Sequence, residues 1–313
     1  MNFDQAFSIY KNISTSVNSI IKGKNSVVEK VLAAFFTGGH VLLEDAPGTG
    51  KTMLAKTLAK SVDSTFVRIQ CTPDLLPGDI LGVSIFNQET RHFELHKGPV
   101  FTNILLADEI NRTSPRTQSA LLESMAEKQV TIDGKRHALE ESFFVIATQN
   151  PAESRGTYPI PESQMDRFMV KLSLGYASRD DEVEILNGSG FAEKLHQIRP
   201  VCTKEEISQL SRIIENIRIS EELKYYIADI TAASRNFPGV SQGAGTRASL
   251  ALMRMSQSIA FFNKSEFVIP DYIQLVAENV LPHRIMLNSE SKFSGITSES
   301  VVRKIIDSIP VPA

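Results

Sequence analysis

The chain has 313 residues, of which 42% are hydrophobic and 22% are charged, and its formal net charge is −3. This is the composition of an ordinary globular protein, with enough chain for one large or two medium domains. The slightly acidic balance argues against nucleic acid as the main partner, because nucleic acid selects a basic surface.

Targeting signals and cysteine spacing point to an ordinary intracellular protein. The N-terminal stretch MNFDQAFSIY has neither the basic start nor the apolar run of a signal peptide, and no apolar run is long enough to cross a membrane. Cys71 and Cys202 are far apart and fit no metal or redox spacing. We therefore expect a cytoplasmic protein, not itself a membrane protein, with two buried or inactive thiols.

Short apolar runs alternate with helical patterns in the first part of the chain, after a helical stretch over residues 1–37. Runs that are hydrophobic at nearly every position are typical of a parallel sheet covered by helices on both faces. Strand alternating with helix predicts a doubly wound α/β domain up to about Leu174. The expected strands are 40–44, 64–70, 103–108, 143–148 and 168–174.

Two helices and one hairpin can be placed within this region. Apolar residues recur at helical spacing over residues 51–62, and Ser114–Pro115 is an N-cap and first-turn pair for the helix that follows. The Asp-Gly pair within residues 128–139 is a strong signal for a two-residue turn. A β-hairpin is therefore expected just before the strand at 143–148.

Beyond Gly175 the pattern becomes helical. Residues 178–190 predict a capped helix and a turn, and nearly every later segment is amphipathic at helical spacing. Caps or first turns are expected at Thr203, Ser220, Thr246 and Pro270. The predicted division is an α/β domain over residues 1–180, a linker over 181–202 and an all-helical domain over 203–313.

A phosphate-binding loop is predicted where the strand at 40–44 meets the segment Gly48-Thr49-Gly50-Lys51-Thr52. Small residues let backbone N–H groups converge on phosphates, and the following helix adds the positive end of its dipole. Lys51 would reach the terminal phosphates and Thr52 would bind Mg²⁺. A glycine turn followed by an ordinary surface lysine is the alternative, but the strand and helix stand where a phosphate loop requires them.

The loop departs from the pattern G-x-x-x-x-G-K-[ST] at Asp45, where the pattern has glycine. Aspartate tolerates unusual backbone angles better than most residues, and the phosphate contacts are expected from Lys51 and the loop backbone. The Asp45 side chain is therefore expected to point away from the phosphates or to bond nearby backbone. On this basis Asp45→Gly should keep activity within a few-fold.

A second motif, ILLADEINR over residues 104–112, is an apolar strand that ends in Asp108 and Glu109 and matches a Walker B element. Asp108 would belong to the Mg²⁺ shell, and Glu109 would polarise the attacking water. A solvated acidic strand end is the common alternative. The place of the pair after the phosphate loop, with a strand and a helix between, favours the catalytic interpretation.

Three further polar residues fit the same site. Asn150 follows an apolar strand and could orient water or contact the γ-phosphate, although asparagine before proline is more often a turn residue. Arg167, beside Asp166, fits an arginine finger that reaches a neighbouring subunit's nucleotide, with a surface ion pair as the alternative. Arg247 follows Thr246, an expected N-cap. The helix dipole disfavours a cation there, so an anion such as phosphate is the expected partner.

Together these motifs resemble the AAA+ ATPases, and longer runs resemble the MoxR family over nearly the whole chain. The runs are CTPDLLPGDILG, KGPVFTNILLADEINR, QSALLESMAEKQVTIDG, FFVIATQNPAESRGTYPIPESQMDRF and VLPHRI. The resemblance implies an AAA+ αβα core of the P-loop NTPase type over residues 1–180. It also implies a helix-two insert near 78–96, a presensor β-hairpin near 128–142 and a helical lid.

The resemblance implies a role for each matching residue. Catalysis falls to Glu109, to Asn150 as sensor 1, to Arg167 as the finger and to Arg247 as sensor 2. Mg²⁺ would be held by Thr52 and Asp108. ATP would be bound by Gly23, which borders the adenine, and by Pro47, Gly48, Thr49, Gly50, Lys51, Thr52, Met53 and Asp108.

The implied activity is Mg²⁺-dependent ATP hydrolysis by a homo-oligomeric ring, expected to be a hexamer. MoxR ATPases typically work with partners that carry von Willebrand factor A domains and help to assemble or mature other complexes. Such a partner and a protein client are therefore expected, and nucleic acid is not.

Three other functions fit parts of the pattern. A metal-chelatase motor subunit shares the insert and the hairpin, and co-purification with a very large chelatase subunit would favour it. A nucleic-acid translocase could line a pore with Lys135, Arg136 and His137, but the net charge and the lack of an aromatic-basic stripe count against it. A nucleotide-binding scaffold without turnover is disfavoured because every catalytic position is present.

Overall fold

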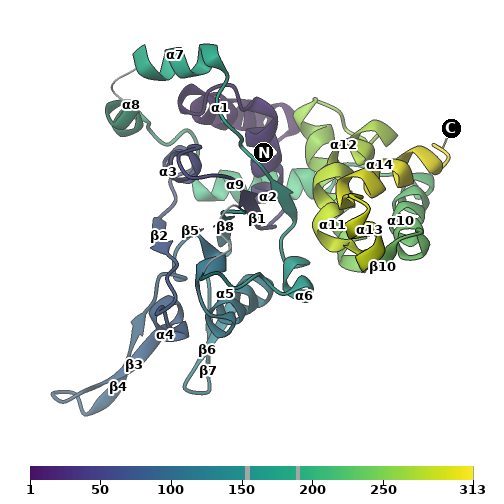
Figure 1. Ribbon diagram of the computed structural model, residues 1–313. Coiled ribbons are helices and arrows are strands. Elements are labelled where there is room, and N and C mark those ends of the chain that lie inside the picture. The colour runs from purple at the N-terminus through teal and green to yellow at the C-terminus, as the bar shows by residue number, and fades with distance from the viewer. Residues whose placement is uncertain (152–155, 188–190, 313) are drawn as a thin grey trace.

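The computed structural model describes residues 1–151, 156–187 and 191–312, which form an αβα core followed by a lid (Figure 1). The central sheet of the core consists of β1 (Val41–Glu44), β2 (Phe66–Gln70), β5 (Ile104–Asp108), β8 (Phe144–Gln149) and β9 (Val170–Leu172). The core helices are α1 (Phe3–Ile20), α2 (Asn25–Phe36), α3 (Lys51–Ser61), α4 (Pro77–Leu81), η1 (Ile110–Arg112), α5 (Pro115–Glu127) and α6 (Glu162–Met165).

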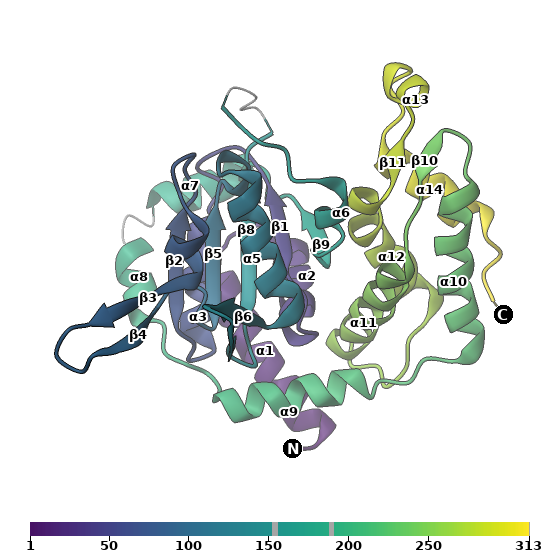
Figure 2. The same cartoon turned by 90° about the horizontal axis from the view of Figure 1, so that it is seen from below.

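The central sheet is parallel throughout, in the order β2-β5-β8-β1-β9 (Figure 2). Alternate residues of a strand point to opposite faces, so a strand covered on both faces must be apolar at every position. Val41 and Leu43 pack with α1, α2 and α3, whereas Leu42 packs with α4 and α5 on the opposite face. The predicted doubly wound α/β core is confirmed, and so are all five of its strands.

Local sequence signals define the other expected core elements. Ser114 caps α5, its hydroxyl accepting a hydrogen bond from the Thr117 N–H at 3.3 Å. The expected hairpin consists of β6 (Gln129–Ile132) and β7 (Lys135–Ala138). Its turn residues Asp133 and Gly134 both have positive φ, 48° and 74°, the geometry that Asp-Gly favours in a two-residue hairpin turn.

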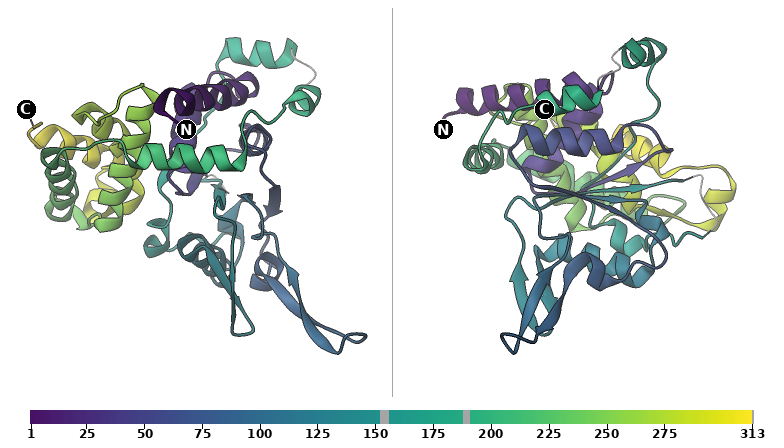
Figure 3. Two further views of the ribbon diagram at one scale, coloured as in Figure 1. Left: turned by 180° about the vertical axis from the view of Figure 1, so that it is seen from behind. Right: turned by 90° about the vertical axis from the view of Figure 1, so that its left-hand side faces the viewer.

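A second hairpin lies in the region expected for the helix-two insert. It follows α4 and consists of β3 (Gly82–Asn87) and β4 (His92–Lys97), paired in antiparallel register. Both hairpins project from the same side of the core (Figure 3). This confirms the insert and the presensor hairpin as separate additions to the central sheet.

Most of the segment expected to be a linker is helical. It contains α7 (Arg179–Asn187) and α8 (Phe191–Gln197), and α8 packs against α1. The Ser178 hydroxyl accepts a hydrogen bond from the Asp181 N–H at 3.2 Å, which confirms the expected cap of α7. The turn expected after α7 falls at residues 188–190, outside the described residues.

The lid is helical, as expected, except for one short antiparallel pair formed by β10 (Val240–Gln242) and β11 (Met286–Leu287). The all-helical prediction missed this pair because two or three residues give no readable alternation. The lid helices are α9 (Lys204–Glu215), α10 (Glu221–Asn236), α11 (Thr246–Phe262), α12 (Pro270–Val280), η2 (Pro282–Arg284), α13 (Ser289–Phe293) and α14 (Ser298–Ser308).

The expected lid caps are right at Thr203 and Ser220, whose side chains accept hydrogen bonds from first-turn N–H groups. The prediction of Thr246 as an N-cap was wrong. Gly245 is the N-cap of α11 and has an extended backbone, and its carbonyl accepts a hydrogen bond from the Ala248 N–H. Thr246 is the first helical residue, so Arg247 still lies in the first turn.

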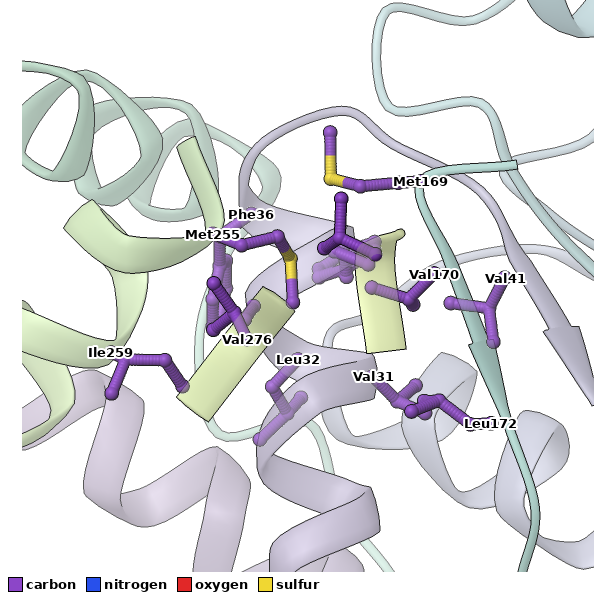
Figure 4. Packing of buried hydrophobic residues seen from close by; sticks show 14 of the residues in the cluster. Val31, Leu32, Phe36, Val41, Met169, Val170, Leu172, Met255, Ile259 and Val276 are labelled. Atoms are coloured by element: carbon purple, nitrogen blue, oxygen red, sulfur yellow. The ribbon is translucent and has the colours of Figure 1, made fainter. Parts of the chain in front are cut away.

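The core and the lid share one hydrophobic cluster (Figure 4). Phe36 and Leu32 of α2 meet Met255 and Ile259 of α11 within this cluster, and Met169 lies beside them. Helix α9 crosses the boundary as well, because it packs against α1, α2 and α11 (Figure 2). The lid is therefore packed onto the core over a continuous apolar surface.

Both cysteines are buried, as expected, and burial raises the pKa of each thiol to about 12. Such thiols carry little thiolate and react slowly. Within the described residues, no helix combines the length and the apolar character that a membrane span needs.

A buried histidine just before β1 joins this strand to β8 of the same sheet and to α5. The Nδ1 atom of His40 accepts a hydrogen bond from the Val145 N–H at 3.0 Å, so the proton resides on Nε2, which donates to the Met125 carbonyl at 3.0 Å. Burial lowers the pKa of His40 to about 4. His40 is therefore neutral in the folded protein, because burial disfavours its charged form.

This histidine predicts acid sensitivity. The folded pKa lies below the unfolded value of 6.5, so the unfolded state binds more protons between these values and stability is lost as the pH falls through this window. Lowering the pH from 7 to 5 should reduce the free energy of unfolding by about 2 kcal/mol through this site. Guanidinium unfolding of His40→Gln should lack that component. The exposed control His92→Gln should retain it; equal pH slopes in the two variants would contradict the assignment.

Candidate active site

The loop between β1 and α3 has the geometry of an anion site. Gly48 and Gly50 have φ values of 85° and 93°, in the left-handed region that glycine adopts without strain. A Cβ at either position would meet no atom within 4 Å, so open space lies over the loop. Gly50 is the N-cap of α3 and has no side chain to satisfy the first-turn N–H groups, which favours an anion there.

Lys51 begins α3 and reaches back over the same loop. Its Nζ donates to the carbonyl oxygens of Asp45 and Ala46 at 2.9 and 3.1 Å. Thr49 also belongs to the loop, and its hydroxyl donates to the Ala46 carbonyl at 3.4 Å. The ammonium group therefore lies at the entrance of the loop, where it can bind phosphate oxygens.

The carboxyl end of β5 places Asp108 and Glu109 opposite the loop, and Thr148 of β8 joins them. The Thr148 hydroxyl donates to Asp108 Oδ1 at 2.6 Å and accepts from the Glu109 N–H at 2.8 Å. Glu109 has φ 58° and ψ 50°, a left-handed conformation that costs free energy for a residue other than glycine. Strain of this kind is concentrated at functional sites, where the surrounding structure holds it in place.

Two residues of β2 bind this acidic pair, and no sequence motif singled them out. The guanidinium of Arg68 donates to Asp108 Oδ2 from Nε at 3.1 Å and from Nη2 at 2.6 Å. Gln70 Nε2 donates to Glu109 Oε2 at 2.9 Å. Arg68 and Gln70 are two residues apart on one face of the strand. The pattern alone gave no indication that β2 lies beside β5.

These groups line one cavity of about 410 Å³ at the carboxyl edge of the sheet. Asn150, which directly follows β8 and is 5% exposed, is part of its wall. The structure thus brings the loop, the acidic pair and Asn150 together, as predicted. The lining residues are Pro47, Gly48, Gly50, Lys51, Thr52, Met53, Arg68, Gln70, Asp108, Glu109 and Asn150.

The donor set fits Mg²⁺ bound together with a phosphate. Thr52 and Asp108 offer a hydroxyl and a carboxylate oxygen, and Mg²⁺ prefers oxygen ligands and retains several waters. Among the described residues there is no group of three or more His, Cys, Asp or Glu side chains that could hold a metal alone. The two predicted ligands therefore suit an ion that arrives with its nucleotide.

Gly23 lies outside the phosphate cavity. Its φ is 66°, and a Cβ there would overlap the Asp181 carboxylate at the start of α7. The neighbouring Lys24 donates from Nζ to the Tyr176 carbonyl at 2.6 Å. Glycine is thus required by a close approach between the α1–α2 turn and the segment after β9, and its role beside the adenine stays a prediction.

The Asp45 side chain turns away from the loop, as expected, but its partners lie far from it in the sequence. Its Oδ1 accepts hydrogen bonds from the Ser173 hydroxyl at 2.7 Å and the Gly175 N–H at 2.8 Å, and its Oδ2 accepts one from the Leu174 N–H at 2.8 Å. Asp45 is 4% exposed. The residue that breaks the loop pattern therefore ties the start of the loop to the chain that leaves β9.

Arg167 and Arg247 lie together, but away from the phosphate cavity. They line a separate cavity of about 720 Å³ between the core and the lid. Arg167 donates from Nη1 to the Leu122 carbonyl of α5 at 3.2 Å, and Arg247 forms an ion pair with Asp166 at 3.0 Å. Neither arginine lines the cavity that holds Lys51.

Comparison with known proteins agrees with this arrangement. The family model described as "ATPase family associated with various cellular activities (AAA)" matches residues 40–170, and the model described as "AAA lid domain" matches residues 232–305. A solved structure of a Cytophaga hutchinsonii protein assigned as an ATPase superposes with a TM-score of 0.92 at 39% identity. It covers 99% of this chain and 97% of that one.

Sequence relatives decide the family. The chain is 37% identical to Chaperone MoxR1 of Mycobacterium tuberculosis over 95% of this chain and 80% of that protein. The chain belongs to the MoxR family of AAA+ ATPases. This MoxR-family chain is also 48% identical to the Bacillus subtilis protein YeaC, over 95% of this chain and 92% of YeaC.

The contacts of Asp45 change the expected effect of its replacement in this MoxR-family ATPase. Asp45→Gly leaves two backbone N–H groups and the Ser173 hydroxyl without their acceptor, and should lower the free energy of unfolding by about 2–4 kcal/mol. Calorimetric ATP binding should weaken as well, because the start of the loop is released. The matched control Ser173→Ala removes one donor and leaves the carboxylate bound to backbone. Equal stability of Asp45→Gly and the parent would refute this role.

Proposed function

We propose that this protein hydrolyses ATP with Mg²⁺ and uses the energy to remodel or mature protein complexes. The observation that carries the proposal is the single cavity in which Lys51 and Thr52 face Asp108, Glu109 and Asn150. Mg²⁺-ATP, when bound, supplies the phosphoryl group and the cation that neutralises its charge. The protein supplies positioning, an electrostatic environment and a base.

Glu109 is the proposed base for the attacking water. Its carboxylate is oriented by Gln70 at 2.9 Å and by Arg112 Nη1 at 3.3 Å, and its backbone is held by Thr148. Asn150 stands at the same edge and can orient the water or the γ-phosphate. Lys51 and the loop backbone bind the phosphates, and Thr52 and Asp108 hold the cation.

The placement of Arg167 and Arg247 supports a ring. An arginine finger must contact the phosphates, yet both residues line the cavity between core and lid rather than the phosphate cavity. They can therefore serve the nucleotide of an adjacent copy, which requires a head-to-tail contact that closes into a ring. We propose a homo-oligomer, with a hexamer as the expected size, in which both arginines act between subunits.

The proposed clients are proteins. The relative named Chaperone MoxR1 supports a chaperone-like role, and we propose a partner with a von Willebrand factor A domain. Affinity capture with a variant that binds ATP but hydrolyses it slowly would identify both. Recovery of a very large chelatase subunit instead would assign the protein to the metal-chelatase motors.

The catalytic assignment predicts two distinct defects. Lys51→Ala should abolish ATP binding, because the loop loses the ammonium group that is proposed to bind the terminal phosphates. Glu109→Gln should still bind ATP but hydrolyse it about 10²–10⁴-fold more slowly, since an amide cannot accept the proton from water. Calorimetry measures the binding and phosphate release measures the turnover. Normal turnover in either variant would contradict the assignment of the site.

The ring predicts rescue between defective subunits. Arg167→Ala alone should lose about 10³-fold or more in turnover. Mixing it with Lys51→Ala subunits should restore phosphate release, because the Lys51→Ala subunit still offers Arg167 to a neighbour whose own site is intact. Mixtures that stay inactive would argue against a finger that acts between subunits.

A further inference from the structure

Asp166, the residue before Arg167, is shared by two arginines of the lid. Its Oδ1 accepts a hydrogen bond from Arg284 Nε at 2.8 Å, and its Oδ2 accepts one from Arg247 Nη1 at 3.0 Å. The Arg247 side chain is 56% exposed, whereas that of Arg284 is 2% exposed. One carboxylate on the core thus binds a buried and an exposed lid arginine at once.

Arg284 also binds the backbone on the far side of Arg167. It donates from Nη2 to the Phe168 carbonyl at 2.6 Å and from Nη1 to the Met169 carbonyl at 3.1 Å. Another bond from Nη1 goes to the carbonyl of Val280, within the lid itself. The planar guanidinium therefore fixes residues 166 to 169 against η2 and the end of α12 in a single orientation.

The neighbouring histidine, His283, contacts the same segment of the core. His283 Nε2 lies 3.0 Å from the Phe168 carbonyl, so consecutive residues of η2 both bind the short segment that carries Arg167. Asp166, Arg167, Arg247 and Arg284 all line the cavity between core and lid. Because Arg167 lies between two positions that Arg284 holds, the direction in which it leaves the backbone depends on this contact.

The charge of Arg284 makes the pairing with Asp166 necessary. Burial lowers the pKa of Arg284, and the hydrogen bond and negative charge of Asp166 oppose that effect. A buried guanidinium without a counter-charge destabilises the folded state, so Arg284 of the lid requires Asp166 of the core. A lysine at position 284 would keep the charge but could not reach Asp166, Phe168 and Met169 together.

We propose that Arg284 and Asp166 form a clasp between lid and core that positions Arg167 and Arg247 for the nucleotide of the neighbouring subunit. This inference rests on the proposed ring function. Arg284 is a positioning residue, because it does not line the phosphate cavity and acts through the segment that carries Arg167. Loss of Arg284 should misplace the arginines that a subunit presents to its neighbour, Arg167 and Arg247. It should leave the subunit's own nucleotide site intact.

The first measurement separates turnover from binding. Arg284→Lys should reduce kcat about 10–100-fold, the range expected when catalytic groups are misplaced by about 1 Å. Its calorimetric ATP affinity should stay within about twofold of the parent, because the clasp does not line the phosphate cavity. The matched control is Arg303→Lys, which alters an exposed lid ion pair with Glu278 and should change neither quantity.

The second measurement asks where the defect acts. In an equal random mixture of Arg284→Lys and Lys51→Ala subunits, roughly one interface in four pairs an intact nucleotide site with a neighbour whose clasp is intact. Phosphate release should return at those interfaces. Asp166→Asn should behave in the same way. It keeps the shape and one acceptor oxygen of a side chain that is 29% exposed, and calorimetric ATP binding like that of the parent would show that it folds without the counter-charge.

The outcomes distinguish the clasp from the ring on which it rests. Rescue of both Arg167→Ala and the clasp variants supports the proposal. Rescue of Arg167→Ala without rescue of the clasp variants overturns the clasp and leaves the ring standing. Failure of Arg167→Ala itself to be rescued overturns the ring. Unchanged kcat in both Arg284→Lys and Asp166→Asn also overturns the clasp.

Discussion

The active site depends on the parallel direction of the five central strands. Because every strand runs the same way, the residues that follow β1, β5 and β8 meet at one edge of the sheet, although they are far apart in the chain. The phosphate loop, the acidic pair and Asn150 are those residues. This geometry requires both faces of the sheet to be apolar. In β1, Val41 and Leu43 pack on one face and Leu42 packs on the other, and all three are buried.

The sequence predicted the elements that local chemistry determines. Apolar and β-branched runs predicted the five strands, Ser114 predicted the start of α5, and an Asp-Gly pair predicted the β6–β7 turn. The residues of the phosphate loop and the acidic pair were found because each set lies at or just after the end of a strand. The N-cap of α11 was misplaced by one residue, since Thr246 has the chemistry of a cap but the extended backbone belongs to Gly245.

Side chains whose partners lie on distant strands could not be predicted in this way. Arg68 and Gln70 became part of the site only because β2 pairs with β5, and strand order is not written in the pattern of either strand. Asp45 was judged by what a phosphate loop needs, whereas its partners are three groups that follow β9. For Arg167 and Arg247, the residue types were visible, but their separation from Lys51 required the packed lid.

The shared hydrophobic cluster has a consequence for how the chain can be divided. The AAA and lid models match separate regions, residues 40–170 and 232–305. Leu32 and Phe36 of α2, just before the first region, pack with Met255 and Ile259 of the second (Figure 4). An excised lid would expose the apolar faces of α11 and α12, and the remaining core would expose α2. The two regions are therefore expected to depend on each other for stability, because neither can bury its share of this apolar surface alone.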